Sequence, residues 1–483
     1  MAKNNKVNRQ KNDKKSAKGK KSSKAVKAFC IGIPLALIVA LGVALPVNAK
    51  SVIKTPPLGE RTLEQEKKLS SVLDTLYPER KSVGLTPLPK EYFGLDEYEI
   101  EAKSAIIVDV KTGSIIWEKN ADEQIPPASM TKIVEMYVVL EAVKNGTISL
   151  DDVVPLPPES WEVNLPSDAS RMHLAKGQVV TLRELLLGLA IASGNDASIA
   201  VANYVAGNME DFVSRMNGAV KRFGLEKTHF VESSGYSEKN LTTAREFALF
   251  ARQYILDFPD ALKEFHAKPS LRYPTRKNMP DGSTPVSYTQ NNTNKLLSKI
   301  QGCDGLKTGF IYESGYNISV TAEMNGTRFL SVTMGGPGNN TVEGNSFRVS
   351  DNMTLFNYAF SHYADYHAPT EENKHEFTVG IFGGAEKSVK LVPAFDETFT
   401  VPKITSDSPT GAAASVYVRA DVPRYLYGKI ECGKQYGTIT YMIDDEVLRV
   451  LPLVADRDVE LGGFFNRTLG KLDEILLDAI LKD

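Results

Sequence analysis

The order of strand-like and helix-like segments is the feature that most constrains the fold of this 483-residue chain. Lys111-Thr112-Gly113 joins the first two β-type runs and indicates a hairpin, and Asn325-Gly326 marks another between the last two. The region between 129 and 256 has helical patterns instead. Strands first, helices in the middle and strands last predict an α+β domain whose terminal strands share one antiparallel sheet. The β-type runs are residues 104–110, 113–118, 305–310, 316–323 and 328–334.

Three helices are predicted in the middle of this domain. The first begins at Ser129, is apolar on nearly every face and stops at Gly146, so we expect it to be a buried central helix. The other two begin at the capping-box patterns Thr181-Leu-Arg-Glu184 and Thr243-Ala-Arg-Glu246.

The composition changes on both sides of this domain. Residues 50–100, rich in Pro, Lys and Glu, predict a spacer with one short helix, and residues 375–455 alternate short β-type runs with Gly, Pro and Asp. The sequence therefore predicts a main domain over 101–367, a small all-β domain over 375–455 and a C-terminal helix within 456–483.

The N-terminus predicts export from the cytoplasm. Residues 1–27 carry eleven Lys or Arg and one acid, and an apolar run over 29–45 follows, with small residues at Val47 and Ala49. This pattern fits a signal peptide cleaved after Ala49; the alternative is an uncleaved anchor over 1–49. In either case the body lies outside the cytoplasm. That body has 46 basic against 58 acidic residues, which argues against a nucleic-acid partner.

Cysteines and histidines predict no metal site. The six histidines lack metal-ligand spacing and no Cys-x-x-Cys is present, so we expect neither metal nor cofactor. Cys30 lies in the signal, and whether Cys303 and Cys432 pair is left open.

The first motif with chemical potential is Ser129-Met130-Thr131-Lys132 at the start of the buried helix. Spacing of three residues places the Ser129 hydroxyl and the Lys132 amine on one helix face. Burial favours a neutral amine, which could accept the hydroxyl proton and make Ser129 nucleophilic. The alternative is a purely structural role, with Ser129 capping the helix and Lys132 on the surface. The apolar residues around Lys132 disfavour this alternative.

Two further motifs complete the set. Ser193-Gly194-Asn195 interrupts two helical stretches, where it could direct polar groups into a site or be an ordinary helix junction. Lys307-Thr308-Gly309 lies in a β-type run that could aim Lys307 at the same site, while Gly309 would let the substrate backbone approach. The earlier Lys111-Thr112-Gly113 is interpreted as a hairpin turn.

These three motifs in this order resemble those of the serine penicillin-recognising enzymes. The sequence around these motifs is similar to that of low-molecular-mass D-alanyl-D-alanine carboxypeptidases over roughly residues 100–365, although that family often has Asp where Glu246 stands. The matching runs are 107–109, 117–122, 126–132, 191–197, 243–246 and 304–310.

The resemblance implies a transpeptidase-like sandwich and a role for each motif residue. Ser129 would form the acyl-enzyme with Lys132 as base, while Ser193 and Asn195 would relay protons and hold the substrate amide. Lys307 and Thr308 would bind the terminal carboxylate, with Arg348 as a looser candidate, and Gly309 completes the substrate-binding set. The backbone N–H groups of Ser129 and Phe310 would form the oxyanion hole. The implied partners are peptidoglycan stem peptides ending in D-Ala-D-Ala, and β-lactam antibiotics as inhibitors.

Other activities remain open at this stage. A class A β-lactamase shares the acylation step, but no counterpart of its Glu-x-x-x-Asn loop is found between Asn195 and Lys307. A catalytically dead binding module is disfavoured because every motif residue is present. The sequence does not distinguish carboxypeptidase from endopeptidase or transpeptidase action, and it does not give the third stem-peptide residue or the oligomeric state.

The C-terminal helix is predicted to be amphipathic and to lie on the outer face of the cytoplasmic membrane. Phe465, Leu469, Leu472, Leu476 and Ile480 form a wide apolar stripe. The competing interpretation is packing on the chain's own β-domain, which the few cations of this helix favour.

Overall fold

The computed structural model describes residues 58–81, 84–366, 375–403, 416–443 and 445–480; the predicted signal or anchor lies outside them. The main domain is built on a six-stranded sheet in the order β1-β3-β2-β8-β7-β6, antiparallel except where β1 pairs with β3. The predicted α+β class and shared sheet are confirmed. The strands are β1 (Thr86–Pro87), β2 (Ser104–Asp109), β3 (Ser114–Lys119), β6 (Cys303–Ile311), β7 (Gly315–Met324) and β8 (Thr327–Gly336).

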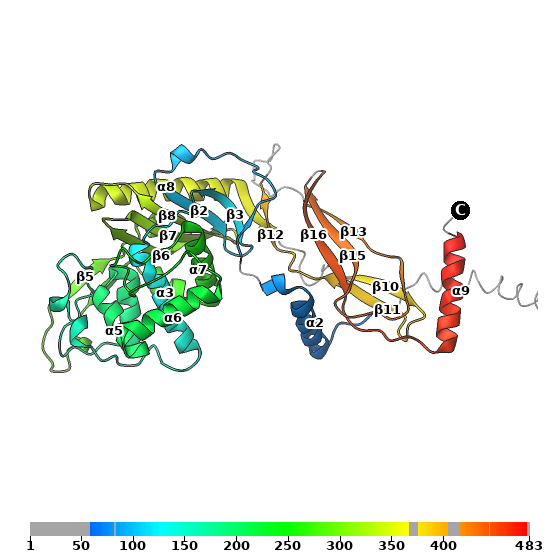
Figure 1. Cartoon of the computed structure of the whole chain (residues 1–483), viewed down its shortest axis with the longest axis horizontal. Helices are drawn as coiled ribbons and strands as arrows, with labels where there is room; N and C mark the ends of the chain where they lie inside the picture. Colours follow the sequence, from blue (N-terminus) through cyan, green and yellow to red (C-terminus); the bar gives the residue numbers. More distant parts are fainter. Residues whose placement is uncertain (1–57, 82–83, 367–374, 404–415, 444, 481–483) are drawn as a thin grey trace, which may run out of the picture.

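Helices cover both faces of this sheet (Figure 1). Ile106 of β2 packs with the helical region that contains α3, whereas its neighbour Ile107 packs with α8, because successive strand residues face opposite sides. This explains why β2 is buried along its whole length. The helices of the domain are α3 (Lys132–Lys144), α4 (Leu182–Leu187), α5 (Asn195–Ala206), α6 (Met209–Arg222), α7 (Ala244–Asp257) and α8 (Thr341–His362); the short strands β4 (Ser270–Tyr273) and β5 (Tyr288–Asn291) pair beside them.

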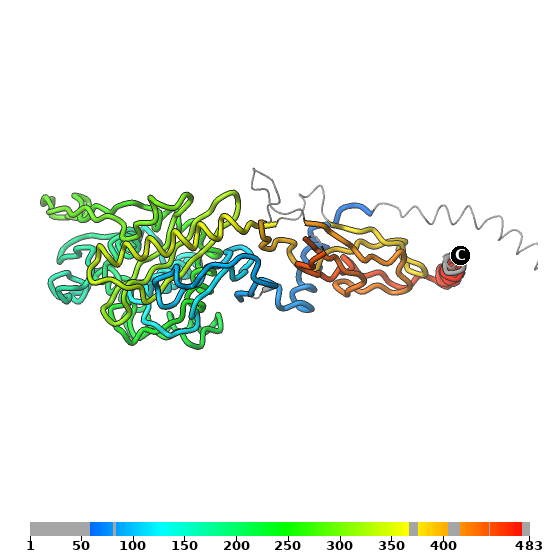
Figure 2. Tube along the Cα trace, turned by 90° about the horizontal axis from the view of Figure 1, so that it is seen from above, coloured from blue at the N-terminus to red at the C-terminus, as the bar shows by residue number. Residues whose placement is uncertain are grey.

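A second, all-β domain follows, and the two bodies lie end to end (Figures 1 and 2). They are joined by β9 (Tyr363–Tyr366), which pairs with β12 (Phe399–Pro402), and by Thr400, whose hydroxyl donates to Asp109 at 2.7 Å. The other strands form one sheet in the order β13-β15-β16-β11-β10-β14. They are β10 (Phe377–Phe382), β11 (Ser388–Pro393), β13 (Tyr417–Asp421), β14 (Tyr425–Tyr427), β15 (Gln435–Ile443) and β16 (Glu446–Ala455).

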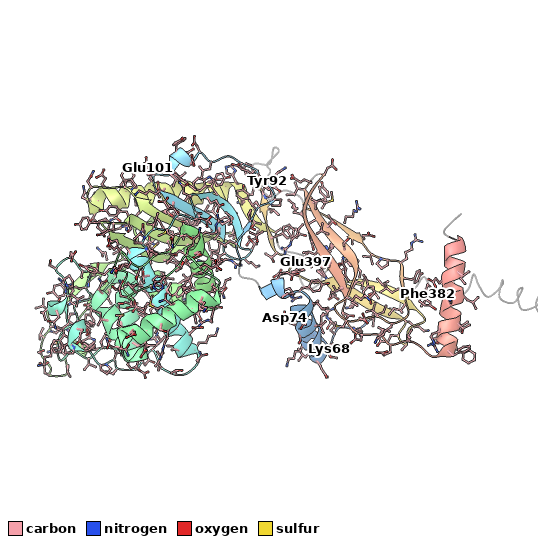
Figure 3. All side chains as sticks on the ribbon, viewed as in Figure 1. Lys68, Asp74, Tyr92, Glu101, Phe382 and Glu397 are labelled. Carbon is pink, nitrogen blue, oxygen red and sulfur yellow. The ribbon has the colours of Figure 1, made fainter. Side chains whose placement is uncertain are left out.

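The segment before the main domain contacts both bodies. Helix α2 (Leu63–Leu76) buries Leu69 and Leu73 against the β-domain, and Lys68 pairs with Asp458 at 2.8 Å. Figure 3 shows Lys68 on this helix, below the β-domain. Strand β1 then joins the sheet of the main domain, so residues expected as a spacer form a second connection between the bodies.

The last helix, α9 (Phe464–Ile480), stands across the end of the β-domain, opposite the main domain (Figure 1). Within the described residues, none of the helices has the length and apolar character needed to span a bilayer.

Candidate active site

Ser129 lies in a short 3₁₀ turn, Ala128–Thr131, that leads directly into α3. Ala128 has a φ of 51°, so the chain turns sharply just before the nucleophile candidate. Asn317 on β7 donates to the carbonyl of Pro126 at 2.9 Å and fixes the approach to this turn. Ser129 itself stays partly exposed, whereas Ala128 and Met130 are buried. The turn thus presents one hydroxyl from an otherwise packed segment.

Lys132 is fully buried and lies within hydrogen-bond reach of Ser129. Its Nζ is 3.1 Å from Ser129 Oγ, 2.9 Å from Asn195 Oδ1 and 2.5 Å from the Ser234 carbonyl. Burial lowers the pKa of Lys132 to about 8, against the opposing influence of nearby carboxylates. An amine with this pKa is partly neutral near physiological pH, so it can accept a proton from the hydroxyl.

Asn195 reaches this amine because the second motif breaks a helix. A π-helical turn, Gly188–Ala192, follows α4 and ends at Ser193, whose φ of 58° is left-handed. Helix α5 then begins at Asn195. The structure therefore brings Asn195 to Lys132, and Ser193 lies buried at the break two residues earlier.

The third motif brings a second buried amine to the site from β6. Lys307 is only 1% exposed, and its pKa lies well below the usual value because of burial and the neighbouring cations Lys132 and Arg348. Thr308 beside it donates to Thr293 at 2.7 Å. A buried cation opposed by other cations is poorly stabilised, so this position favours an anionic ligand. By contrast, the earlier Lys-Thr-Gly at 111–113 lies at the β2–β3 turn.

Arg348 of α8 adds a third cation, at the position the sequence resemblance suggested only loosely. Its guanidinium donates to the Gly309 carbonyl and to Asn345 Oδ1, and lies 4.9 Å from the centre of the Tyr316 ring. Burial lowers the pKa of Arg348 to about 10. The arginine is therefore fixed against the strand that carries Lys307.

Two glycines allow β6 and a loop to approach the nucleophile turn. A Cβ on Gly309 would lie 2.4 Å from the Pro127 carbonyl oxygen and 3.1 Å from Ser129 N. A Cβ on Gly235 would lie 1.9 Å from the Ala128 carbonyl oxygen. Sequence reasoning missed Gly235 and the adjacent Ser234 carbonyl, although the run Ser233-Ser234-Gly235 is itself a turn signal.

In the described part of the chain, no three His, Cys, Asp or Glu side chains are grouped so that they could hold a metal ion. Cys303 and Cys432 are free thiols.

Comparisons with known proteins identify the family of both domains. Residues 92–338 match the family described as D-alanyl-D-alanine carboxypeptidase, and residues 365–461 match the C-terminal domain of penicillin-binding protein 5. D-alanyl-D-alanine carboxypeptidase DacA of Haemophilus influenzae is 30% identical over 379 residues, covering 78% of this chain and 89% of the relative; DacF of Bacillus subtilis is 29% identical over 374 residues, covering 77% and 90%. The crystal structure of penicillin binding protein 5 from Haemophilus influenzae has a TM-score of 0.64 and 28% identity, covering 76% of this chain and all of that one.

Proposed function

Because this chain belongs to the D-alanyl-D-alanine carboxypeptidase family of serine peptidases, we propose that it removes the terminal D-alanine of peptidoglycan stem pentapeptides through an acyl-enzyme on Ser129. The family assignment gives the activity and penicillin binding. The observation that supports the residue roles is the contact of the buried Lys132 amine with Ser129 and Asn195.

In the proposed acylation step, neutral Lys132 takes the proton of Ser129 while the hydroxyl oxygen attacks the carbonyl between the two D-alanines. Asn195 and the Ser234 carbonyl hold the amine at the hydroxyl, so little reorganisation is needed. The proton then passes to the departing D-alanine amine, and we assign Ser193 to that relay because it lies at the same helix break. Water releases the shortened peptide in the second step.

Substrate binding follows from the buried cations. The terminal D-alanine carboxylate would compensate the positive charges of the buried Lys307 and Arg348. Thr308, on the same strand as Lys307, supplies a hydroxyl. The carbonyl oxygen of the scissile bond would accept hydrogen bonds from the N–H groups of Ser129 and Phe310. Gly309 supports this assignment, because a Cβ there would lie 3.1 Å from Ser129 N, so the strand that leads to Phe310 runs close beside the nucleophile turn.

We further propose that the enzyme works outside the cytoplasm with α9 on the membrane surface. Gly470 seats the helix on the β-domain, where a Cβ would lie 2.4 Å from Gly383 N. That contact leaves Phe465 80% and Leu469 56% exposed, so packing on the chain's own β-domain does not cover this first part of the apolar stripe.

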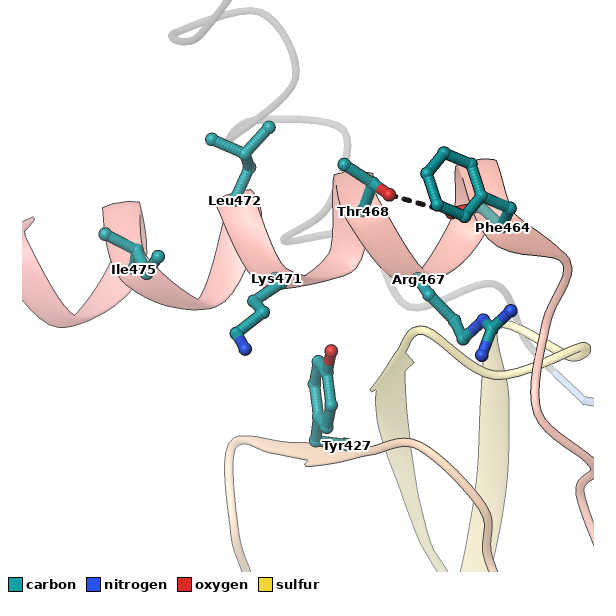
Figure 4. Close-up of a pocket in the computed structure, with 7 residues that line it drawn as sticks. All are labelled: Tyr427, Phe464, Arg467, Thr468, Lys471, Leu472 and Ile475. Carbon is teal, nitrogen blue, oxygen red and sulfur yellow. Dashed lines mark hydrogen bonds between the residues drawn. The ribbon is translucent and has the colours of Figure 1, made fainter.

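The charges of α9 support the same orientation. A groove between the helix and Tyr427 is lined by Arg467 and Lys471 and also by Phe464 and Leu472. In Figure 4 the two cations lie on the side of the helix that faces Tyr427, and the two apolar side chains lie on the other side. With the apolar side in the lipid, these cations would lie beside the helix at the level of the head groups. The peptidase domain, at the other end of the molecule, would be held away from the bilayer.

The decisive experiment is mass spectrometry of products from a stem pentapeptide and from a cross-linked stem dimer. Loss of one alanine from the pentapeptide alone is expected; cleavage of the dimer would establish endopeptidase action instead. A penicillin adduct that lasts minutes or longer is also expected, and steady-state hydrolysis at tens per second would favour a β-lactamase.

A further inference from the structure

Glu135 is a carboxyl group buried beside the catalytic lysine without a full set of partners. It lies on α3 one turn beyond Lys132, and its side chain is fully buried. Its Oε2 accepts a hydrogen bond from Ser198 at 2.9 Å, whereas Oε1 has no hydrogen-bond partner in the described part of the chain. Because burying a carboxyl group with a free oxygen is costly, its position next to the reaction centre needs a reason.

Two serine hydroxyls connect Glu135 to the loop that holds the lysine amine. Ser198 Oγ lies 2.6 Å from Ser233 Oγ. The next residue, Ser234, accepts a hydrogen bond from Lys132 Nζ through its carbonyl. Glu135 and Lys132 thus share one helix face, and the hydrogen bonds from Glu135 lead to the residue next to the one that holds the lysine amine.

The two groups also influence each other's charge. Burial raises the pKa of Glu135 to about 8, in the range to which it lowers that of Lys132. An ionised Glu135 stabilises the Lys132 ammonium ion, and a protonated Glu135 does so much less. Glu232 and Asp196 also favour the ammonium form, and the cation Lys307 opposes it.

We propose that Glu135 is a positioning residue for acylation: it stabilises the ammonium ion that Lys132 becomes on taking the Ser129 proton, and so sets the pH range in which the amine acts as base. Glu135 acts through Lys132 and does not touch the substrate. The proposal rests on the proposed roles of Ser129 and Lys132.

The test is the pH dependence of the acylation rate constant with a fluorescent penicillin, for the wild type and three variants. Glu135→Gln keeps the shape of the side chain and removes its charge. The acidic limb of the pH–rate profile of this variant is expected to move to lower pH by about one unit, because Lys132 becomes a weaker base. For the same reason the acylation rate constant on the plateau of the profile should fall. Glu135→Asp should return the limb toward the wild-type position. Glu141→Gln removes a partly exposed carboxylate of α3 that pairs with Arg222, and should leave the profile unchanged.

The position of the limb decides the outcome. A lower rate at every pH with an unmoved limb would mean that Glu135 is only structural, and a limb at higher pH would contradict the sign of its effect; either overturns the proposal. If Glu135→Gln folds poorly, Ser198→Ala should move the limb in the same direction, because it removes the hydrogen bond that favours ionised Glu135. Failure of the proposed function is recognised separately, as penicillin labelling that survives in Ser129→Ala.

Discussion

Gly235→Ala should disable the nucleophile without touching any group that reacts. Gly235 has a φ of 79°, and its missing Cβ leaves room for the Ala128 carbonyl, one residue before Ser129. Gly224 provides a matched control, because its φ is 70° and a Cβ there would meet no atom within 4 Å. Both variants place alanine in the left-handed region, but only Gly235→Ala adds a collision with backbone.

The magnitudes follow from these two terms. Left-handed backbone costs alanine roughly 1–2 kcal/mol, so Gly224→Ala should lower Tm by about 2–8 °C in a domain of this size. At Gly235 the Cβ would lie 1.9 Å from the Ala128 oxygen, so the nucleophile turn must also shift by about 1 Å. A displacement of that size in a reacting group costs on the order of 10²-fold in rate.

Acylation by a fluorescent penicillin measures the displacement of the nucleophile turn, and thermal unfolding measures the cost of left-handed backbone. The expected result is a loss of about 10²-fold in the acylation rate constant for Gly235→Ala, with near wild-type acylation for Gly224→Ala. Equal acylation rates for the two variants would refute the argument that the loop fixes the nucleophile turn.

Four further outcomes are expected. Ser129→Ala should abolish labelling by penicillin, and Lys132→Ala should fold but acylate roughly 10²–10⁴-fold more slowly, as measured by gel fluorescence and mass spectrometry. A chain ending at Gly463 should partition less into liposomes than one ending at 483, when both begin at residue 50; equal partition would mean that α9 serves packing alone. Burial lowers the pKa of His266 to about 4, so the free energy of unfolding should fall by on the order of 3 kcal/mol as pH falls from about 6.5 to 4. His266→Gln should remove most of this decrease, as measured by urea titrations at the two pH values.

Elements with strong local signals were predictable from the sequence. The Asn325-Gly326 turn joins β7 to β8, and Thr181 makes both hydrogen bonds of the capping box with Glu184. At the second pattern Thr243 caps α7, but the carboxylate of Glu246 accepts from the Lys227 N–H and the Thr228 hydroxyl. Local spacing predicted the cap correctly, whereas the carboxylate's partners come from a distant segment.

Contacts between distant segments were not predictable in this way. The sequence predicted only a spacer with one short helix here, because the surface that Leu69 and Leu73 cover belongs to residues more than 300 positions later in the chain. Gly309 shows the same limit within the site. The sequence suggested that it admits substrate backbone, and in the structure a Cβ there would strike the protein's own Pro127 carbonyl.

The buried cations explain why the motifs, once assembled, favour one class of ligand. Lys132, Lys307 and Arg348 come from α3, β6 and α8, and each has a lowered pKa because the fold removes it from water. For Lys307 the neighbouring charges also oppose the ammonium form, so its charge is held at a free-energy cost that the proposed substrate carboxylate would offset. Lys132 differs because carboxylates, Glu135 first among them, support its charge. In the proposed mechanism the same burial therefore makes Lys307 an anion site and Lys132 a proton acceptor, and the difference lies in the charged groups around each lysine.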